Sequence, residues 1–210
     1  SAGAIIAHYM IGLGHKHIAY ISTTLNEANS ARVRRLEGVR DTYRDECPEG
    51  SVIVRSREVT PKEERDNISI EHAVGFELTR KCLGERPIAG GIIKTLKRRE
   101  GGDLPHYNIM SIDGIDNCKD VLDAIRAEGR RVPEDYSVCG FDNIFPSQFL
   151  PVGLTTVEHY IADKGRNAFE ILHSKMSGES SDRNITRVEF KHHLIVRDST
   201  AAPRGEEKTG

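Results

Sequence analysis

The sequence predicts an α/β protein built on a parallel sheet. Short apolar runs, typical of buried strands, alternate along the chain with longer segments whose apolar residues recur at helical spacing. Strands and helices that alternate in this way form β-α-β units, in which neighbouring strands run parallel and helices cover the sheet. The chain has 210 residues, a length that suits one large domain or two small ones.

The predicted strands are short apolar or alternating runs bounded by polar residues, glycine or proline. They are residues 17–22, 51–56, 107–113, 136–141 and 151–157, followed by late strands within 186–199. Residues 88–93 also fit a strand, although the charged, glycine-broken residues around them favour an irregular loop over 86–106.

The predicted helices carry an apolar stripe and have a capping residue at the start or glycine at the end. They are residues 4–13, a segment that begins at Asn29 or Ser30, residues 70–84, a segment around 121–125 that ends before Gly129, and residues 158–177. The polar residues 61–67 are expected to form a loop, and residues 204–210 a disordered tail.

The composition argues against several classes of function. With a formal net charge of −2, the chain lacks the basic excess that binds nucleic acid or an anionic membrane surface. No apolar run approaches the roughly 20 residues of a membrane-spanning helix. We find no basic-then-apolar leader, and the four cysteines lack C-x-x-C spacing. We therefore expect a cytoplasmic protein with free thiols.

The clearest candidate for a binding residue is Asp142, which directly follows the apolar strand in "VPEDYSVCGFDN" (132–143). Ligands of an open parallel sheet bind beyond the carboxyl ends of its strands. A carboxylate at such an end accepts hydrogen bonds from the hydroxyl or N–H groups of a polar ligand. The alternative is that Asp142 only caps the turn that follows the strand.

Arg32 occupies a comparable place, at the start of the helix that follows the strand 17–22. Its guanidinium group would present a fork of hydrogen-bond donors to the same edge of the sheet. The alternative is a solvated helix face, because Arg34, Arg35 and Arg40 lie nearby in the sequence.

Other motifs do not support catalysis or a metal site. The G-x-G of residues 12–14 precedes a strand, whereas a phosphate-binding loop follows one. Residues 113–117, "DGIDN", place their glycine too early for a calcium loop. The neighbouring histidines at 15/17 and 192/193 lack an evident carboxylate partner, and no order of side chains suggests a nucleophile. We expect no enzyme activity, no metal and no cofactor.

Five longer segments share a further pattern. They are "IGLGHKHIAYIS" (11–22), "SARVRRLEG" (30–38), "GRRVPEDYSVCGFDN" (129–143), "LTTVEHYIADKGRNAFEIL" (154–172) and "HHLIVRDSTAAP" (192–203). Together they resemble the effector-binding domain of the lactose- and purine-repressor (LacI/GalR) family of bacterial transcription regulators. The resemblance runs from about residue 3 to residue 203, and its glycine-phenylalanine-aspartate block is specific.

The resemblance implies a type I periplasmic-binding-protein-like fold, with a small effector of the sugar or nucleobase class in the cleft between two subdomains. Full-length members carry an N-terminal helix-turn-helix headpiece, and their dimers bind palindromic operators. We therefore expect the effector-sensing portion of a homodimeric LacI-type regulator, which contacts operator DNA only through a headpiece absent from this chain. The alternative is a solute-binding protein of a transport system with the same architecture.

The resemblance also implies roles for single residues. Asp142 resembles the aspartate that grips the ligand. Arg32 resembles the arginine that contacts the effector, although an extra residue before Gly38 leaves Arg35 as a rival. His159 falls where many members have a glutamine or histidine that faces the cleft.

Two further positions depart from the family pattern. Ile70 lies where an aromatic residue often stacks on the ligand, and it cannot stack as a ring does. Gly114 and Ile115 replace the usual Asn-Asp pair, so that Asp116 or Asp113 would have to substitute through a shifted loop. The standard asparagine contact is therefore in question.

By this resemblance, residues 1–203 form a partial effector-binding domain. Residues 14–145 and 185–200 are expected to form the C-terminal subdomain, and residues 146–180 to return to an incomplete N-terminal subdomain. The apolar stripe of the helix 158–177, which includes Phe169 and Leu172, would then face water. Because burying each such side chain is worth roughly 1.5–3 kcal/mol, we expect this helix to repack, to associate with a partner surface or to lose order.

Overall fold

The computed structural model describes residues 1–26, 30–67, 70–84, 108–112, 118–143, 145–177 and 187–203 of the chain. At its centre lies a six-stranded sheet in the order β2-β1-β3-β4-β5-β6. The strands are β1 (His17–Ser22), β2 (Ser51–Ser56), β3 (Asn108–Ile112), β4 (Val138–Phe141), β5 (Thr155–Glu158) and β6 (His193–Ile195). The first five run parallel and β6 pairs antiparallel with β5, which confirms the predicted α/β class.

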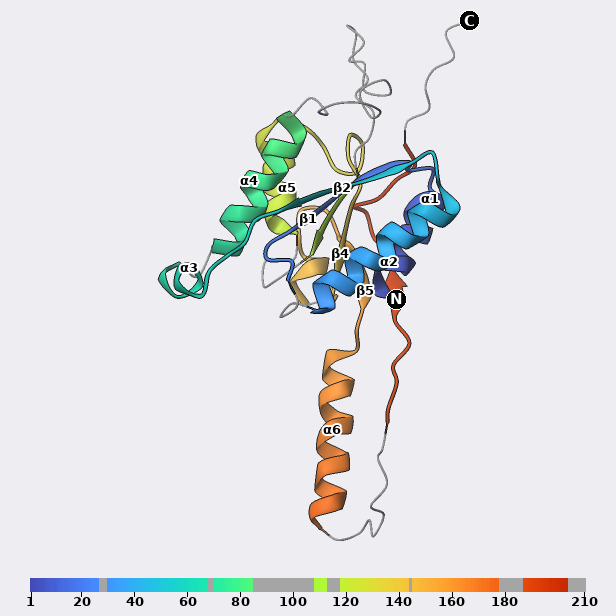
Figure 1. Cartoon of the computed structure of the whole chain (residues 1–210), viewed down its shortest axis with the longest axis vertical. Helices are drawn as coiled ribbons and strands as arrows, with labels where there is room; N and C mark the ends of the chain where they lie inside the picture. The colour runs from blue at the N-terminus through green and yellow to red at the C-terminus, as the bar shows by residue number, and fades with distance from the viewer. Residues whose placement is uncertain are drawn as a thin grey trace, which may run out of the picture.

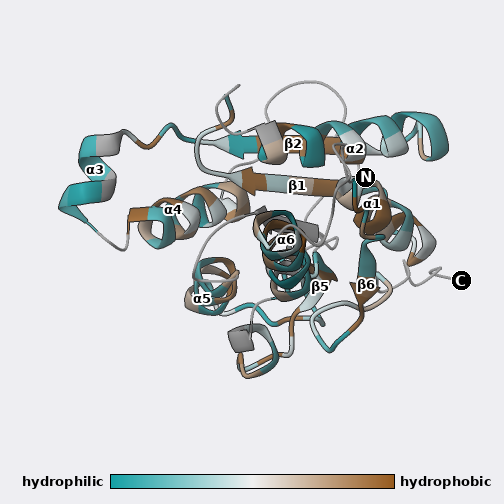
Figure 2. Ribbon diagram, turned by 90° about the horizontal axis from the view of Figure 1, so that it is seen from below, coloured by the Kyte–Doolittle hydropathy of each residue, from teal (hydrophilic) through white to brown (hydrophobic). Residues whose placement is uncertain are grey.

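Helices α1 (Ala2–Gly12) and α2 (Ser30–Glu46) cover one face of this sheet, and α4 (Ile70–Gly84) and α5 (Lys119–Ala127) cover the other (Figure 2). The structure also describes α3 (Pro61–Asp66), α6 (Ile161–Met176) and a short 3-10 helix, η3, at Phe145–Gln148. Strand β1 divides the core because successive side chains point to opposite faces. Ile18 and Tyr20 pack with α1 and α2, whereas Ala19 and Ile21 pack with α4 and α5.

Helices α1 and α2 cross with their backbones close together. A Cβ atom at Gly3 would lie 1.9 Å from the carbonyl oxygen of Arg35, and one at Gly38 would lie 2.0 Å from Oγ of Ser1. At Gly3 the contact is with backbone, so only glycine permits this approach, whereas at Gly38 the Ser1 side chain would have to move. The crossing therefore fixes the first turns of α2, which carry Arg32 and Arg35, against the rest of the domain.

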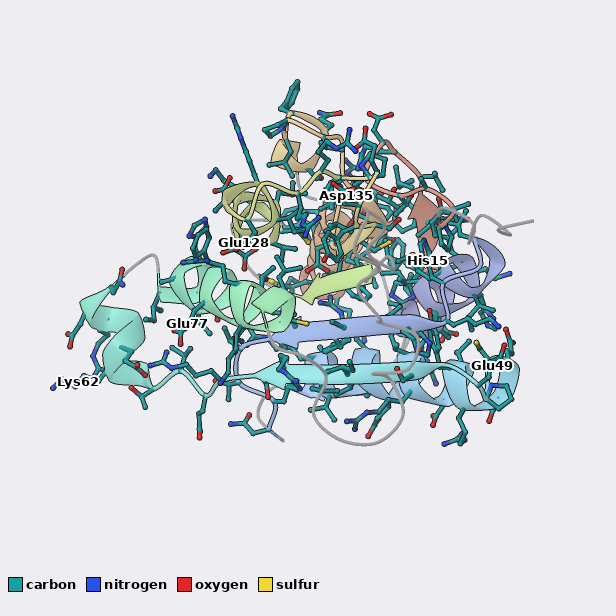
Figure 3. All side chains as sticks on the ribbon, turned by 90° about the horizontal axis from the view of Figure 1, so that it is seen from above. His15, Glu49, Lys62, Glu77, Glu128 and Asp135 are labelled. Atoms are coloured by element: carbon teal, nitrogen blue, oxygen red, sulfur yellow. The ribbon has the colours of Figure 1, made fainter. Side chains whose placement is uncertain are left out.

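The segment after β6 is fastened to the amino-terminal edge of the sheet. Ser199 donates a hydrogen bond from Oγ to the carbonyl oxygen of Val138 and accepts one from the N–H of Thr155. Nε2 of His15 lies 2.7 Å from the carbonyl oxygen of Ala201, and Figure 3 shows His15 beside this end of the sheet. The buried hydroxyl of Ser199 and Nε2 of His15 thus find partners within the chain.

Helix α6 projects from the sheet as an arm, and residues 187–192, which lead into β6, run beside it (Figure 1). The helix is regular from Ile161 to Met176, yet the exposed fractions of Phe169 and Met176 are 66% and 78%. The prediction that this helix repacks on the chain or loses order is therefore wrong. Its association with a partner surface stays a prediction.

Several predicted boundaries differ from the structure. Residues 61–66 form α3, because Thr60 accepts from the N–H of Glu63 while the Glu63 carboxylate accepts from the N–H of Thr60, a capping box that the polar composition concealed. Strand β5 pairs with β4 in the main sheet, so the chain leaves the sheet after Glu158 and not at residue 146. The late strands reduce to β6 among the described residues.

The irregular segment predicted for 86–106 and the tail at 204–210 lie outside the described residues, as does the strand considered at 88–93. Among the helices that the structure describes, none has the length and apolar character needed to cross a membrane.

Candidate functional site: the carboxyl edge of the sheet

Polar side chains gather where the parallel strands end. Ser22 closes β1 and Thr23 follows it, Asp142 and Asn143 follow β4, and Glu158 closes β5. Because parallel strands present their carboxyl ends at one edge, these residues share that edge of the sheet. The start of α2, with Arg32 and Arg35, lies against it.

Asp142 forms an ion pair with Arg35 at this edge. Nη2 of Arg35 donates to Oδ1 of Asp142 at 2.7 Å. The guanidinium carbon of Arg35 also lies 4.7 Å from the centre of the Phe141 ring, a cation–π geometry. The exposed fractions of the two side chains are 13% for Arg35 and 30% for Asp142, so the pair is shielded and still reachable from solvent.

His159 faces the same carboxylate from the end of β5. Its Nε2 lies 3.6 Å from Oδ1 of Asp142, which is beyond hydrogen-bond distance, and this buried atom has no hydrogen-bond partner among the described residues. The ring of His159 meets that of His192 edge-on, with centroids 4.4 Å apart. The pKa of His159 is lowered to about 4, mainly by burial; Asp142 opposes this shift, and Arg35 contributes to it. The imidazole is therefore neutral at pH 7.

The backbone around these groups is constrained. Asp142, Asn143 and Tyr160 have φ angles of 76°, 41° and 53°, in the left-handed region that side chains other than Asn and Asp rarely adopt. For Tyr160, at the start of α6, the conformation is an outlier of the kind that clusters at ligand-binding sites and hinges.

A second layer of hydrogen bonds holds the turn after β4. The amide of Asn143 donates from Nδ2 to Glu158 at 2.7 Å and accepts from Nη2 of Arg197 at 2.7 Å. Burial on its own would raise the pKa of Glu158, but the hydrogen bonds from Asn143 and from the N–H groups of Tyr160 and His159 outweigh it and lower that pKa. Glu158 is thus a fixed carboxylate that orients Asn143.

Arg32 belongs to a separate cluster. It donates to Oγ1 of Thr23 at 2.6 Å and to Oε1 of Glu71 at 3.3 Å, and Thr23 donates to the same Glu71 oxygen. The hydroxyl of Tyr20 donates to the carbonyl oxygen of Arg32. This cluster connects the end of β1 with the starts of α2 and α4.

The structure therefore separates the predicted effector residues into two groups. Asp142 and His159 lie together with the rival arginine, Arg35, whereas Arg32 pairs with Glu71. Ile70 starts α4 beside Glu71 and packs, half-buried, against the core. Asp116 and Asp113 lie outside the described residues.

Sequence reasoning missed Thr23, Glu71, Asn143, Glu158 and Arg197. The signal for three of them was available, since Thr23, Asn143 and Glu158 end or follow predicted strands, as Asp142 does. Glu71 and Arg197 reach the edge from other elements, and only the fold brings them there.

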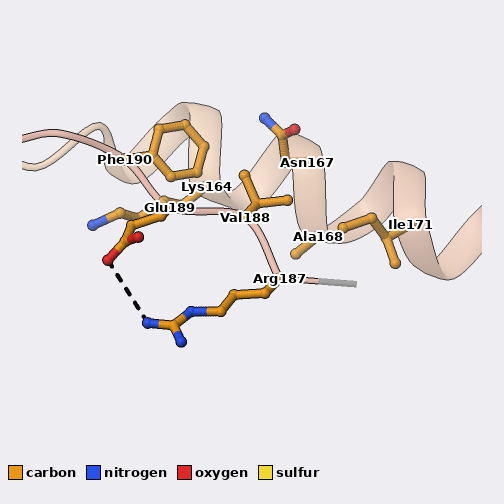
Figure 4. Close-up of a pocket in the computed structure, with 8 residues that line it drawn as sticks. All are labelled: Lys164, Asn167, Ala168, Ile171, Arg187, Val188, Glu189 and Phe190. Carbon is orange, nitrogen blue, oxygen red and sulfur yellow. Dashed lines mark ion pairs between the residues drawn. The ribbon is translucent and has the colours of Figure 1, made fainter. Parts of the chain in front are cut away.

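A shallow hollow lies on the arm (Figure 4). It is lined by Lys164, Asn167, Ala168, Ile171, Arg187, Val188, Glu189 and Phe190. None of the predicted effector residues is among them, and its one ion pair, between Arg187 and Glu189, is highly exposed. No group of three or more histidine, cysteine, aspartate or glutamate side chains suited to a metal ion occurs among the described residues.

Comparison with known proteins assigns this arrangement to a family. The sequence profile of the periplasmic binding protein-like domain matches residues 7–200 of the chain. The chain belongs to that family. The matched residues include all six strands of the sheet, its carboxyl edge and the α6 arm.

Within the family, the chain is similar to LacI/GalR-type regulators. It is 25% identical over 197 residues to the HTH-type transcriptional repressor PurR of Mannheimia succiniciproducens, covering 94% of this chain and 49% of that protein. It is 36% identical over 90 residues to the arabinose metabolism transcriptional repressor of Halalkalibacterium halodurans, covering 41% of this chain and 24% of the other. The longest of these matches shows that the chain spans about half the length of such relatives.

The solved structures agree with this assignment. A LacI-family transcriptional regulatory protein from Corynebacterium glutamicum superposes with a TM-score of 0.67 at 27% identity, over 96% of this chain and 65% of that one. A LacI-family regulator from Enterococcus faecium with bound ribose gives a TM-score of 0.67 at 18% identity, over 96% of this chain and 62% of that one. At that identity the second comparison speaks to the fold alone.

Proposed function

We propose that this chain is the effector-sensing portion of a LacI-type transcription regulator, with a small polar effector of the sugar or nucleobase class bound at the carboxyl edge of the sheet. The observation that carries the proposal is the placement of Asp142. Its carboxylate is half-shielded at the end of β4, beside Arg35 and the neutral His159. Only Oδ1 is engaged by the described residues, so Oδ2 is free to accept from a ligand.

The second cluster supports the same site. Arg32, Thr23 and Glu71 lie at the end of β1 and offer both donors and acceptors. Two groups of polar residues at one sheet edge suit a ligand with several hydroxyl or ring N–H groups. Asp116 and Ile70 complete the proposed set of effector residues.

The proposal extends to the protein as a whole through its relatives. PurR is a repressor of the helix-turn-helix type, and a dimeric form of the Lac repressor is among the similar folds. We propose that effector binding here changes the closure of two subdomains, one built on the six-stranded sheet and one that includes α6. In a cytoplasmic homodimer, that closure would alter operator binding through an N-terminal headpiece.

The comparisons do not favour the alternative of a transport solute-binding protein, because the similar proteins described above are transcriptional repressors and regulators. The same relatives are not enzymes, and we propose that this chain has no catalytic role.

A thermal-shift screen of sugars and nucleobases tests the proposal. We expect at least one compound to raise the melting temperature of the chain, and Asp142→Ala to abolish the rise. Arg80→Ala is the matched control, because Arg80 pairs with Glu128 on the surface of α4 and α5. If a compound stabilises Asp142→Ala as much as the wild type, Asp142 does not bind it. If no compound in the screen raises the melting temperature, the proposed function is contradicted.

A further inference from the structure

Among the described residues of the carboxyl edge, the clearest unused hydrogen-bonding groups are the N–H donors of Arg35. Arg35 uses one of its five N–H donors, on Asp142, and its others have no acceptor among the described residues. The hydroxyl of Ser22, which can donate and accept, is buried without a partner among those residues, and so is Nε2 of His159. Oδ2 of Asp142 is a free acceptor beside them.

The carboxylates of this edge are already engaged. Glu71 accepts from Arg32 and Thr23, and Glu158 accepts from Asn143 and from the N–H of Tyr160. A ligand therefore meets carboxylates whose hydrogen-bond capacity and charge are partly satisfied. Apart from Oδ2 of Asp142, the free N–H donors of Arg35 are therefore the groups that a ligand can bind most readily at this edge.

Among the described residues around this network, the cationic side chains outnumber the carboxylates: they are Arg32, Arg35, Arg197 and Lys164 against Glu71, Asp142 and Glu158. Arg32 pairs with Glu71, and Arg35 pairs with Asp142. Arg197 is held by the carbonyl oxygen of Leu154 and the amide oxygen of Asn143, both uncharged, and has no carboxylate partner among the described residues. Lys164 lies near enough to lower the pKa of His159 and His192, and it too pairs with no described carboxylate. Helix α2 also begins at this edge without an acidic residue in its first turn, which favours a negative charge there.

We infer that the effector carries an anionic group, a carboxylate or a phosphate, and that Arg35 selects it. The anion binds the free N–H groups of Arg35 while Oδ1 of Asp142 holds the guanidinium in place over Phe141. Oδ2 of Asp142 then accepts from a neighbouring hydroxyl of the same molecule. The inference rests on the proposed effector-binding function and narrows it from sugars and nucleobases in general to their acidic derivatives.

A neutral sugar fits the same groups less well. Its hydroxyl groups would compete with Arg35 for Asp142, and no negative charge would replace the partner that the guanidinium loses. An acidic sugar leaves the ion pair intact and adds a charge-assisted hydrogen bond, which is stronger than a neutral one.

Isothermal titration with matched pairs of compounds tests the inference. D-glucose is compared with D-glucuronate, and D-ribose with D-ribose 5-phosphate, so that carboxylate and phosphate are distinguished. We expect an acidic member to bind about tenfold more tightly than its neutral partner, and Arg35→Gln to remove this preference. Arg44→Gln on the exposed face of the same helix, where Arg44 pairs with Asp41 and Asp45, should keep it.

The results separate this inference from the proposed function. Equal or tighter binding of the neutral compounds would overturn the inference, and so would an acidic preference that survives Arg35→Gln. If the neutral compounds bind in a manner that depends on Asp142, the proposed function stands. The absence of binding by both acidic compounds also overturns the inference, while the broader thermal-shift screen decides the function by itself.

Discussion

Leu154 and Leu172 are apolar residues of two neighbouring predicted elements, the strand 151–157 and the helix 158–177, and the fold buries one and exposes the other. Leu154 is fully buried beneath the sheet, where it packs against Gly140, whereas 58% of Leu172 is exposed on α6. Leu154 directly precedes β5 and Leu172 lies in α6, so the difference between them lies in what covers each side chain. An apolar stripe shows that a helix needs a covering surface, and it does not show whether the same chain supplies one.

The candidate site lies at the boundary between these regions. Asp142 and Arg35 belong to the packed body, and His159 stands where the chain leaves β5 for the arm. Tyr160, with its left-handed backbone, follows directly. A movement of the arm would therefore act first on the imidazole that faces Asp142.

Matched truncations of the two leucines test the contrast with the largest expected effect. Leu154→Ala leaves a cavity in the core and should lower the free energy of unfolding by about 3–4 kcal/mol. Leu172→Ala removes only exposed surface and should change it by less than about 0.5 kcal/mol. Urea denaturation of the two variants measures both values. A loss of similar size for Leu172→Ala would mean that α6 is covered in solution.

Two glycines give a second contrast of intermediate size. A methyl group at Gly3 would collide with the backbone of α2 at Arg35, so Gly3→Ala should cost about 2–3 kcal/mol. Nothing lies within 4 Å of a Cβ at Gly165 on α6, and Gly165→Ala should stabilise the helix by up to about 1 kcal/mol. Thermal denaturation measures both effects, with a lower melting temperature expected for Gly3→Ala and a higher one for Gly165→Ala. A lower melting temperature for Gly165→Ala would contradict the exposure of α6.

The pH dependence of stability tests His159, which lies between the packed body and the α6 arm. Because burial lowers the pKa of His159 to about 4 from 6.5, the unfolded chain binds a proton that the folded chain rejects between these values. The contribution of His159 to the free energy of unfolding is therefore fully present above pH 6.5. It is lost as the pH drops toward 4, by about 1–2 kcal/mol between pH 7 and pH 5. Of the charged neighbours, Arg35, His192 and Lys164 oppose protonation and Asp142 favours it.

Chemical denaturation at the two pH values measures this loss, with His159→Gln as the test variant. The variant should show a smaller loss than the wild type, with the remainder due in part to His192, whose pKa burial also lowers. An unchanged loss in His159→Gln would show that His159 is not the group that titrates.

The fold was predictable because alternating strands and helices specify parallel layers, and Asp142 was a candidate because an apolar strand ended on it. Which of Arg32 and Arg35 pairs with Asp142 was not predictable, since both lie in the first turns of α2 and only their three-dimensional directions separate them. The exposure of α6 depends on surfaces that periodicity does not report. Helix α3 was missed because a capping box outweighed its polar composition.

The central claim is that the carboxylate of Asp142 binds a ligand at the end of β4. Titration of the most stabilising compound from the screen into the wild-type chain and into Asp142→Asn, which keeps the shape and removes the charge, tests it most directly. We expect the substitution to weaken binding by about tenfold or more. Equal affinity in the two proteins would contradict the account.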